Sequence, residues 1–345
     1  MPKIYWISNL RVFATLIVVL LHTASNGVYH FGKMPVDSWW ICNIINTFGR
    51  FAVPVFVILS GYLLLDRYDN LATFLSKRFS RIFVPFLIWL FIYMIHGTFK
   101  GIKAEQVNWL SVDWIVRILT NNASGSGQLW FVYMLLGLYL FTPVLSRWFV
   151  AAPKNEVLFF LGMWFVANSC FLVLEKTMNI KPYFDFRYFT GFAGYFVLGA
   201  YLKKYPILPS AQILLLAIAL FLIGWISTMF TVEFFSKQAG KYMDLLGYHS
   251  PLVVMMSLGI VLFFQQILNK PFAEKIIGEI DASSYGIFLF HWLVMKILSR
   301  DFKINFSMYP NPIPGMLLHF ILTTVICIIV IGIIRRLPKG HWITG

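Results

Sequence analysis

Long apolar stretches recur along the whole chain and constrain its fold more than any other feature. Ile213 to Thr228 and Phe320 to Ile334, for example, are almost continuously apolar. A helix of about 20 such residues crosses the roughly 30 Å hydrocarbon layer of a bilayer, whereas barrel strands alternate apolar and polar residues over about ten positions. Because 59% of the 345 residues are hydrophobic and 12% are charged, we predict an all-α, polytopic membrane protein.

The apolar stretches predict about ten transmembrane helices in a single domain that occupies residues 1–345, without a separate soluble part. The predicted spans are 5–26, 43–65, 82–99, 129–149, 157–174, 188–203, 210–230, 251–268, 283–299 and 314–335. Basic clusters around Arg78 and Arg335 lie against span ends, which favours cytoplasmic N- and C-termini. The first span lacks a small-residue cleavage site, so we expect it to be retained.

Charge and cysteine usage exclude other classes of function. The net charge of +14 is spread over loops on both faces and follows from membrane topology, so we predict no nucleic-acid partner. Cys42, Cys170 and Cys327 lie in or beside apolar spans without close pairing. They indicate neither a disulfide framework nor a metal site, and we interpret them as packing residues.

Two polar residues, Arg11 and His22, interrupt the first apolar span. At about 1.5 Å per residue they lie about 16 Å apart along the helix axis, so that one lies near one face of the bilayer and the other beyond its middle. Ionisable residues inside a membrane usually face the bundle interior and mark a pathway or a site. The alternatives are an arginine that snorkels to the interface and an interfacial histidine.

The second span, from Gly49 to Leu63, carries further signals. Pro54 removes a backbone hydrogen bond and predicts a kink. Ser60 and Gly61 allow a helix or a ligand to approach closely, and helix packing is the favoured interpretation. Arg50, at the outer end, either binds an anionic acceptor or caps the span by snorkelling.

The entry to the third span is basic, with Lys77, Arg78 and Arg81. Residues three apart share one face of an α-helix, so Arg78 and Arg81 are suited to bind phosphate oxygens together. Positive-inside anchoring is the favoured alternative.

The ninth span carries Tyr285 and a second membrane histidine, His291. This histidine either orients a substrate or is a hydrogen-bonded core residue.

In the long loop before Gln128, residues 109–119 predict an interfacial amphipathic helix on the outer face that could cover the site.

In combination, these segments resemble the membrane acyltransferase-three family over nearly the whole chain. The opening residues are especially similar to the branch that O-acetylates enterobacterial common antigen. The resemblance is carried by Arg11 and His22, the Arg50 to Leu63 stretch, Arg78 and Arg81 before Ile-Phe-Val-Pro, Leu129-Trp130-Phe131, and Ser284 to His291.

The resemblance implies transfer of an acyl group, usually acetyl, from cytoplasmic acetyl-CoA to a sugar hydroxyl of a surface glycan or lipid-linked oligosaccharide. It implies a location in the bacterial inner membrane, with lipid and acyl-CoA as partners and no metal. Arg11 and His22 are then the catalytic pair, and Lys77, Arg78 and Arg81 hold the CoA phosphates. The expected acceptor-binding residues are Arg50, Gln128, Trp130, Tyr285 and His291. Many relatives have His where this chain has Gln128, which leaves hydrogen bonding by an amide as its role.

A neutral His22 can act as the general base on the sugar hydroxyl or can be acylated first. Arg11 is too far away to contact it, so we assign Arg11 to donor orientation or to an ion pair. The outer-side candidates for a carboxylate partner of His22 are Asp185, Glu233 and Asp244. The alternative function is a transporter or flippase for a lipid-linked glycan or surface polymer, which buried charges and broken helices also suit.

Overall fold

The computed structural model describes residues 4–66, 70–101, 127–178, 191–244 and 247–345, and all regular structure in these ranges is helical. The α-helices are α1 (Tyr5–Val28), α2 (Val36–Phe48), α3 (Ala52–Leu64), α4 (Leu71–Arg78), α5 (Val84–Gly101), α7 (Trp130–Ala151), α8 (Lys154–Phe165), α9 (Phe171–Met178), α11 (Ala193–Lys204), α12 (Ala211–Ala239), α13 (Pro251–Ile267), α14 (Glu274–Arg300), α15 (Pro312–Arg336) and α16 (His341–Thr344).

Seven helical segments of the described chain are long and apolar enough to cross a bilayer. They are Tyr5–Val28, Val36–Leu64, Gly127–Ala151, Lys154–Val173, Ala211–Ala239, Glu274–Arg300 and Pro312–Arg336. The other three predicted spans correspond to α5, α11 and the shorter apolar helix α13. The chain is therefore a multi-pass helical membrane protein, while the count of ten and the sides of the termini stay predictions.

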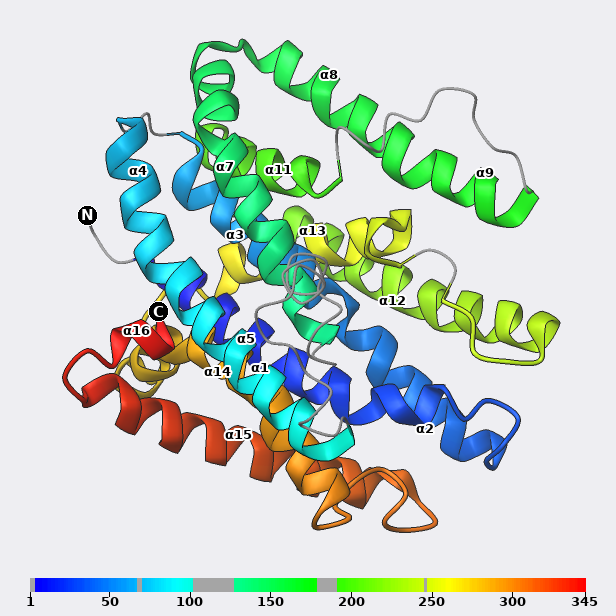
Figure 1. Cartoon of the computed structure of the whole chain (residues 1–345). Helices are drawn as coiled ribbons and strands as arrows, with labels where there is room; N and C mark the ends of the chain where they lie inside the picture. Colours follow the sequence, from blue (N-terminus) through cyan, green and yellow to red (C-terminus); the bar gives the residue numbers. More distant parts are fainter. Residues whose placement is uncertain (1–3, 67–69, 102–126, 179–190, 245–246) are drawn as a thin grey trace.

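Helix α1 lies inside the bundle, where it contacts α2, α3, α13, α14 and α15 (Figure 1). In its most apolar stretch 72% of residues are buried, compared with 17% in α12 and 22% in α15. Helices α12 and α15 thus present apolar side chains at the periphery, where lipid replaces protein as the neighbour. Arg11 and His22 are consequently carried on a helix that other helices enclose.

Helices α3 and α11 pack with their backbones in close contact. A Cβ added to Gly61 would overlap the carbonyl of Phe196, and a Cβ added to Gly199 would overlap the carbonyl of Ile58. Small residues permit this approach between membrane helices. A 3₁₀ turn, Gly49–Phe51, joins α2 to α3 just before Pro54, at the place where the sequence predicts a break in regular helix.

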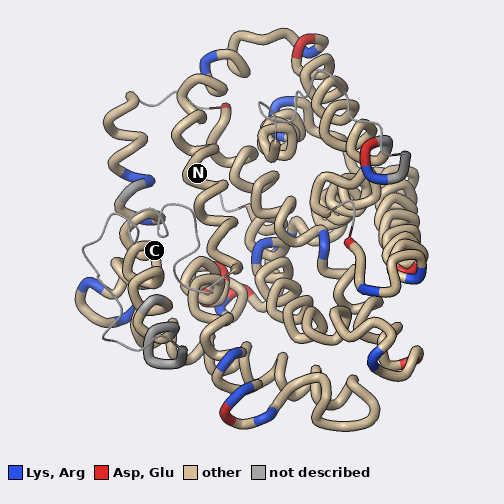
Figure 2. The backbone as a smooth tube through the Cα atoms, turned by 45° about the vertical axis from the view of Figure 1, so that its right-hand side comes forward, with Lys and Arg blue, Asp and Glu red and all other residues tan. Residues whose placement is uncertain are grey.

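Charged residues lie mostly at helix ends and in connections, and long parts of the helices carry none (Figure 2). At one such end, Arg335 and Arg336 of α15 both pair with Glu279 of α14. Arg11 and Arg50 differ because each lies within an apolar segment. Each of these two arginines forms an ion pair with an aspartate, Arg11 with Asp281 and Arg50 with Asp244.

Candidate functional site

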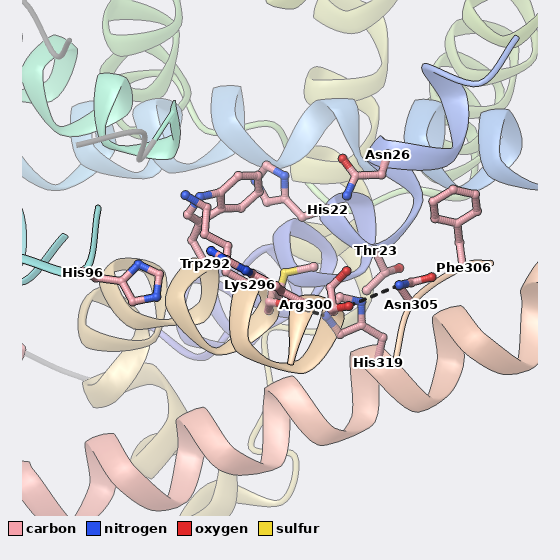
Figure 3. A pocket seen from close by; sticks show the side chains of 12 residues that line it. His22, Thr23, Asn26, His96, Trp292, Lys296, Arg300, Asn305, Phe306 and His319 are labelled. Carbon is pink, nitrogen blue, oxygen red and sulfur yellow. Dashed lines mark hydrogen bonds between the residues drawn. The ribbon is translucent and has the colours of Figure 1, made fainter. Parts of the chain in front are cut away.

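His22 lines a cavity of about 380 Å³ between α1, α5, α14 and α15 (Figure 3). We call this space the His22 cavity. Its walls combine aromatic, amide and cationic side chains: His22, Thr23, Asn26, His96, Trp292, Met295, Lys296, Ser299, Arg300, Asn305, Phe306 and His319. A cavity of this size, largely apolar with a few polar groups, is typical of a small-molecule site.

The imidazole of His22 is held between two neighbouring residues of α14. It stacks on His291, with ring centroids 5.5 Å apart, and meets the edge of Trp292 at 5.0 Å. Nδ1 of the buried His291 lies 2.6 Å from the carbonyl oxygen of Phe288. Because a carbonyl only accepts, this nitrogen donates the hydrogen bond, and Nε2 of the neutral ring is left as an acceptor. Among the described residues that Nε2 has no hydrogen-bond partner.

Arg11 is ion-paired on the same helix α14. Its Nη1 lies 2.8 Å from Oδ1 of Asp281, and the Ser8 hydroxyl donates to Oδ2 of that carboxylate at 2.9 Å. Of the two roles expected for Arg11, the ion pair is therefore present. The pairing joins the first half of α1 to α14, the helix that also carries His291.

Arg11 also lines a second cavity, of about 160 Å³, which we call the Arg11 cavity. Its walls are mostly apolar and include Ser60, Tyr139, Ser284, Tyr285 and Phe288.

The Arg11 cavity and the His22 cavity are separated by a narrow neck, defined by Thr15, Val18, Val19, Phe56, Ile287, Phe288 and His291. Phe56 and Phe288 line both the neck and the Arg11 cavity, and His291 stacks on His22 at the other end. The neck has no room for a water molecule. In this conformation the two cavities are thus neighbours that do not communicate.

The basic segment adjoins the Arg11 cavity. Ile82 lines this cavity, and its carbonyl accepts a hydrogen bond of 2.8 Å from the Tyr285 hydroxyl. The guanidinium of the half-buried Arg78 lies 6.0 Å from the ring centre of Tyr139, another residue of the cavity wall.

The geometry of the basic segment differs from the regular α-helix that we expected. A π-helical turn covers Phe79–Phe83, and it holds more residues per turn than an α-helix. Arg78 is consequently half-buried, while Lys77 and Arg81 are exposed. The two arginines therefore do not share one environment.

Arg50 is buried at the loop that follows α12 and does not line the His22 cavity. It pairs with Asp244 and donates to Asn46 at 2.9 Å and to the Tyr242 hydroxyl at 2.6 Å. Burial raises the pKa of Tyr242 to about 12, although the charge of Arg50 opposes the rise. The guanidinium thus holds the loop onto α2, so snorkelling does not describe it.

The other predicted residues lie apart from the His22 cavity. Gln128 is buried and lines neither the His22 cavity nor the Arg11 cavity. Trp130 packs against Phe192 and Tyr248, with ring centroids 5.8 and 5.6 Å away.

Of the three carboxylates considered for His22, two are paired elsewhere. Asp244 binds Arg50, and Glu233 binds Lys237. Asp185 and the predicted interfacial helix 109–119 lie outside the described residues.

Sequence reasoning missed several residues of the site. His96, Trp292, Lys296 and His319 line the His22 cavity, and Asp281 binds Arg11. His96 lies in a predicted span and Asp281 lies two residues before one, so the sequence offered ionisable residues at these places as signals of a site. Helix α14 begins at Glu274, which places Asp281 within the helix instead of ahead of it.

The fold and the site together define a multi-pass membrane protein with a histidine in a cavity near one end of α1 and an ion-paired arginine beside a second cavity near the other. Residues 4–332 match the model of acyltransferase family 3, which is described as an acyltransferase domain. The chain therefore belongs to this family of membrane acyltransferases. No curated protein and no solved structure matches it.

Proposed function

We propose that the protein is an O-acetyltransferase of a bacterial inner membrane, which moves an acetyl group from cytoplasmic acetyl-CoA to a sugar hydroxyl of a surface glycan. The observation that carries this proposal is the position of His22 in a cavity, between the rings of His291 and Trp292. A neutral imidazole in such a site is suited to general base catalysis. The family membership supports acyl transfer as the reaction.

The donor enters from the side of the basic segment in this proposal. The CoA phosphates bind at Lys77, Arg78 and Arg81, and the pantetheine arm occupies the Arg11 cavity, whose mostly apolar wall suits a flexible chain. To bring the thioester to His22, the arm passes the neck beside Phe288. Arg11, paired with Asp281, positions the wall of this route.

The reaction joins the acceptor oxygen to the carbonyl carbon of the thioester and breaks the carbon–sulfur bond. His22 takes the proton from the hydroxyl and returns it to the departing sulfur, so that the products are the ester and CoA thiol. Acylation of His22 before transfer is the second route that the same residue permits. The free acceptor nitrogen of His291 beside this ring is suited to orient either substrate.

Purified protein in proteoliposomes, with labelled acetyl-CoA and a glycan extract, tests the proposal. We expect His22→Ala to lower acetyl transfer by about 10²–10⁴-fold, the usual contribution of a general base. His341→Ala, which changes an exposed histidine outside both cavities, is the matched control. Wild-type transfer by His22→Ala would refute the proposed role.

The same assay separates the enzyme from a transporter, because a transporter needs no acyl donor. Acetyl-CoA that is neither bound nor cleaved by wild-type protein would contradict the enzyme. Mass spectrometry of surface glycans from cells with and without the gene then identifies the acceptor. Our first expectation for this acceptor is enterobacterial common antigen.

A further inference from the structure

A third cavity, of about 450 Å³, continues outward from the His22 cavity. It lies between the connection of α1 to α2 and the connection of α14 to α15, and we call it the loop cavity. It shares Asn26, Ser299, Asn305 and Phe306 with the His22 cavity. Its other lining residues are His30, Lys33, Met34, Pro35, Ser38, Ser307, Tyr309, Pro310 and Pro312.

The side chains of the loop cavity suit a carbohydrate. Phe306 and Tyr309 offer apolar ring faces to the C–H groups of a sugar, and the amides and hydroxyls around them can both donate and accept hydrogen bonds. His30 packs beside Phe306, with ring centroids 5.3 Å apart, and its Nδ1 lies 2.8 Å from the carbonyl oxygen of Asn26. These contacts hold the aromatic wall against the end of α1, next to His22.

The charge of the two joined cavities has one sign. Lys33 lines the loop cavity, and Lys296 and Arg300 line the His22 cavity. Of the described residues that line either cavity, none is Asp or Glu. A concave site lined by cationic side chains raises the local concentration of an anionic ligand.

We propose that the acceptor is an acidic glycan of at least two sugar units. The sugar that receives the acetyl group lies in the His22 cavity, and the neighbouring part of the glycan lies in the loop cavity with its anionic group beside Lys33. Two joined spaces of about 380 and 450 Å³ exceed what one sugar needs, because pockets of about 300–1,000 Å³ hold drug-sized ligands. This inference rests on the proposed function and adds the class of acceptor.

The anionic group has two chemical sources, a carboxylate on a sugar or the diphosphate of a lipid carrier. Four probes separate them in binding measurements with the full-length protein in nanodiscs. The first pair is a hyaluronan tetrasaccharide and its carboxyl-reduced, neutral form. The second pair is N-acetylglucosamine linked to a polyprenol through a diphosphate and the same sugar linked directly.

We expect at least one anionic probe to bind about tenfold more tightly than its neutral partner, because a hydrogen bond between charged groups is stronger than one between neutral groups. Lys33→Gln should remove most of this difference and Lys33→Arg should keep it. Lys241→Gln, which neutralises an exposed lysine of another loop that lines neither cavity, should leave it unchanged. The pair that shows the Lys33-dependent difference identifies the source of the anion.

Equal affinities within both pairs, no binding of any probe, or a preference that Lys33→Gln does not reduce would overturn the inference. Cleavage of acetyl-CoA by the same preparation is measured in parallel. If cleavage is present while the glycan preference is absent, the acidic-acceptor inference fails and the acetyltransferase stands. If acetyl-CoA is neither bound nor cleaved, the proposed function itself fails.

Discussion

The ion pair of Arg11 and Asp281 shows how a half-buried charge is accommodated within an apolar span. The two side chains are 28% and 17% exposed, so both are largely removed from water. Ser8 donates to the second oxygen of Asp281, which completes a small polar cluster between α1 and α14. Removing one partner of such a pair leaves the other partly desolvated and uncompensated.

Asp281→Asn should therefore lower the free energy of unfolding by about 1–3 kcal/mol, the range for a lost hydrogen bond to a charged group. Thermal unfolding in detergent, followed by tryptophan fluorescence, measures the change. Glu279→Gln on the same helix is the control, because Glu279 is 46% exposed and exposed pairs contribute about 0–1 kcal/mol. Equal losses in the two variants would contradict the importance of burial.

Among the helices, α3 and α11 show how small residues determine packing and also shape a cavity. Gly61 faces the backbone of α11, while Ser60, its neighbour in sequence, lines the Arg11 cavity. We expected Ser60 and Gly61 to allow the close approach of either a helix or a ligand. Gly61 contacts a helix, whereas Ser60 faces a cavity that a ligand could occupy. Adjacent positions of α3 thus face a neighbouring helix and a cavity.

Gly61→Ala should separate α3 from α11, because the added methyl group would overlap the Phe196 carbonyl and backbone atoms cannot move aside easily. We expect most of the protein to be lost from the monodisperse peak in size-exclusion chromatography. Gly137→Ala on α7 is the matched control, since its Cβ would meet no atom within 4 Å. Elution of Gly61→Ala at the wild-type position and yield would contradict this packing.

At the scale of the whole molecule, the proposed mechanism requires a donor and an acceptor to reach His22 from the two cavities on either side of it. The neck between the Arg11 cavity and the His22 cavity is closed by aromatic rings, since Phe288 lies 5.2 Å from Phe131 and 5.8 Å from His291 between ring centroids. In the proposed mechanism, the closed neck keeps water from the donor side until the pantetheine arm fills it. The bundle would then open locally at each turnover.

Phe288→Ala should open the neck and admit water, because it removes a ring from the wall of a space that has no room for a water molecule. We expect the ratio of acetyl-CoA hydrolysis to acetyl transfer to rise several-fold. Phe290→Ala is the control on the same helix, as Phe290 packs on Trp89 and lies outside the neck. If the ratio and the KM for acetyl-CoA are both unchanged, the neck is not on the donor route.

The sequence by itself determined the class of protein, the approximate positions of the helices and the two unusual residues of α1. It could do so because the length of an apolar run corresponds directly to bilayer thickness and because a charge in hydrocarbon is costly. Cys42 and Cys327, interpreted as packing residues, are indeed buried.

Only the tertiary structure decided which residues meet. Asp281 is 270 positions from Arg11, and Asp244 is 194 positions from Arg50. Spans that are apolar on every side carry no periodicity to indicate an inner face, so their rotation and neighbours depend on packing within the bundle. For this reason the sequence could single out His22 as a candidate, whereas its setting between His291, Trp292 and the cavity that it lines could not be predicted.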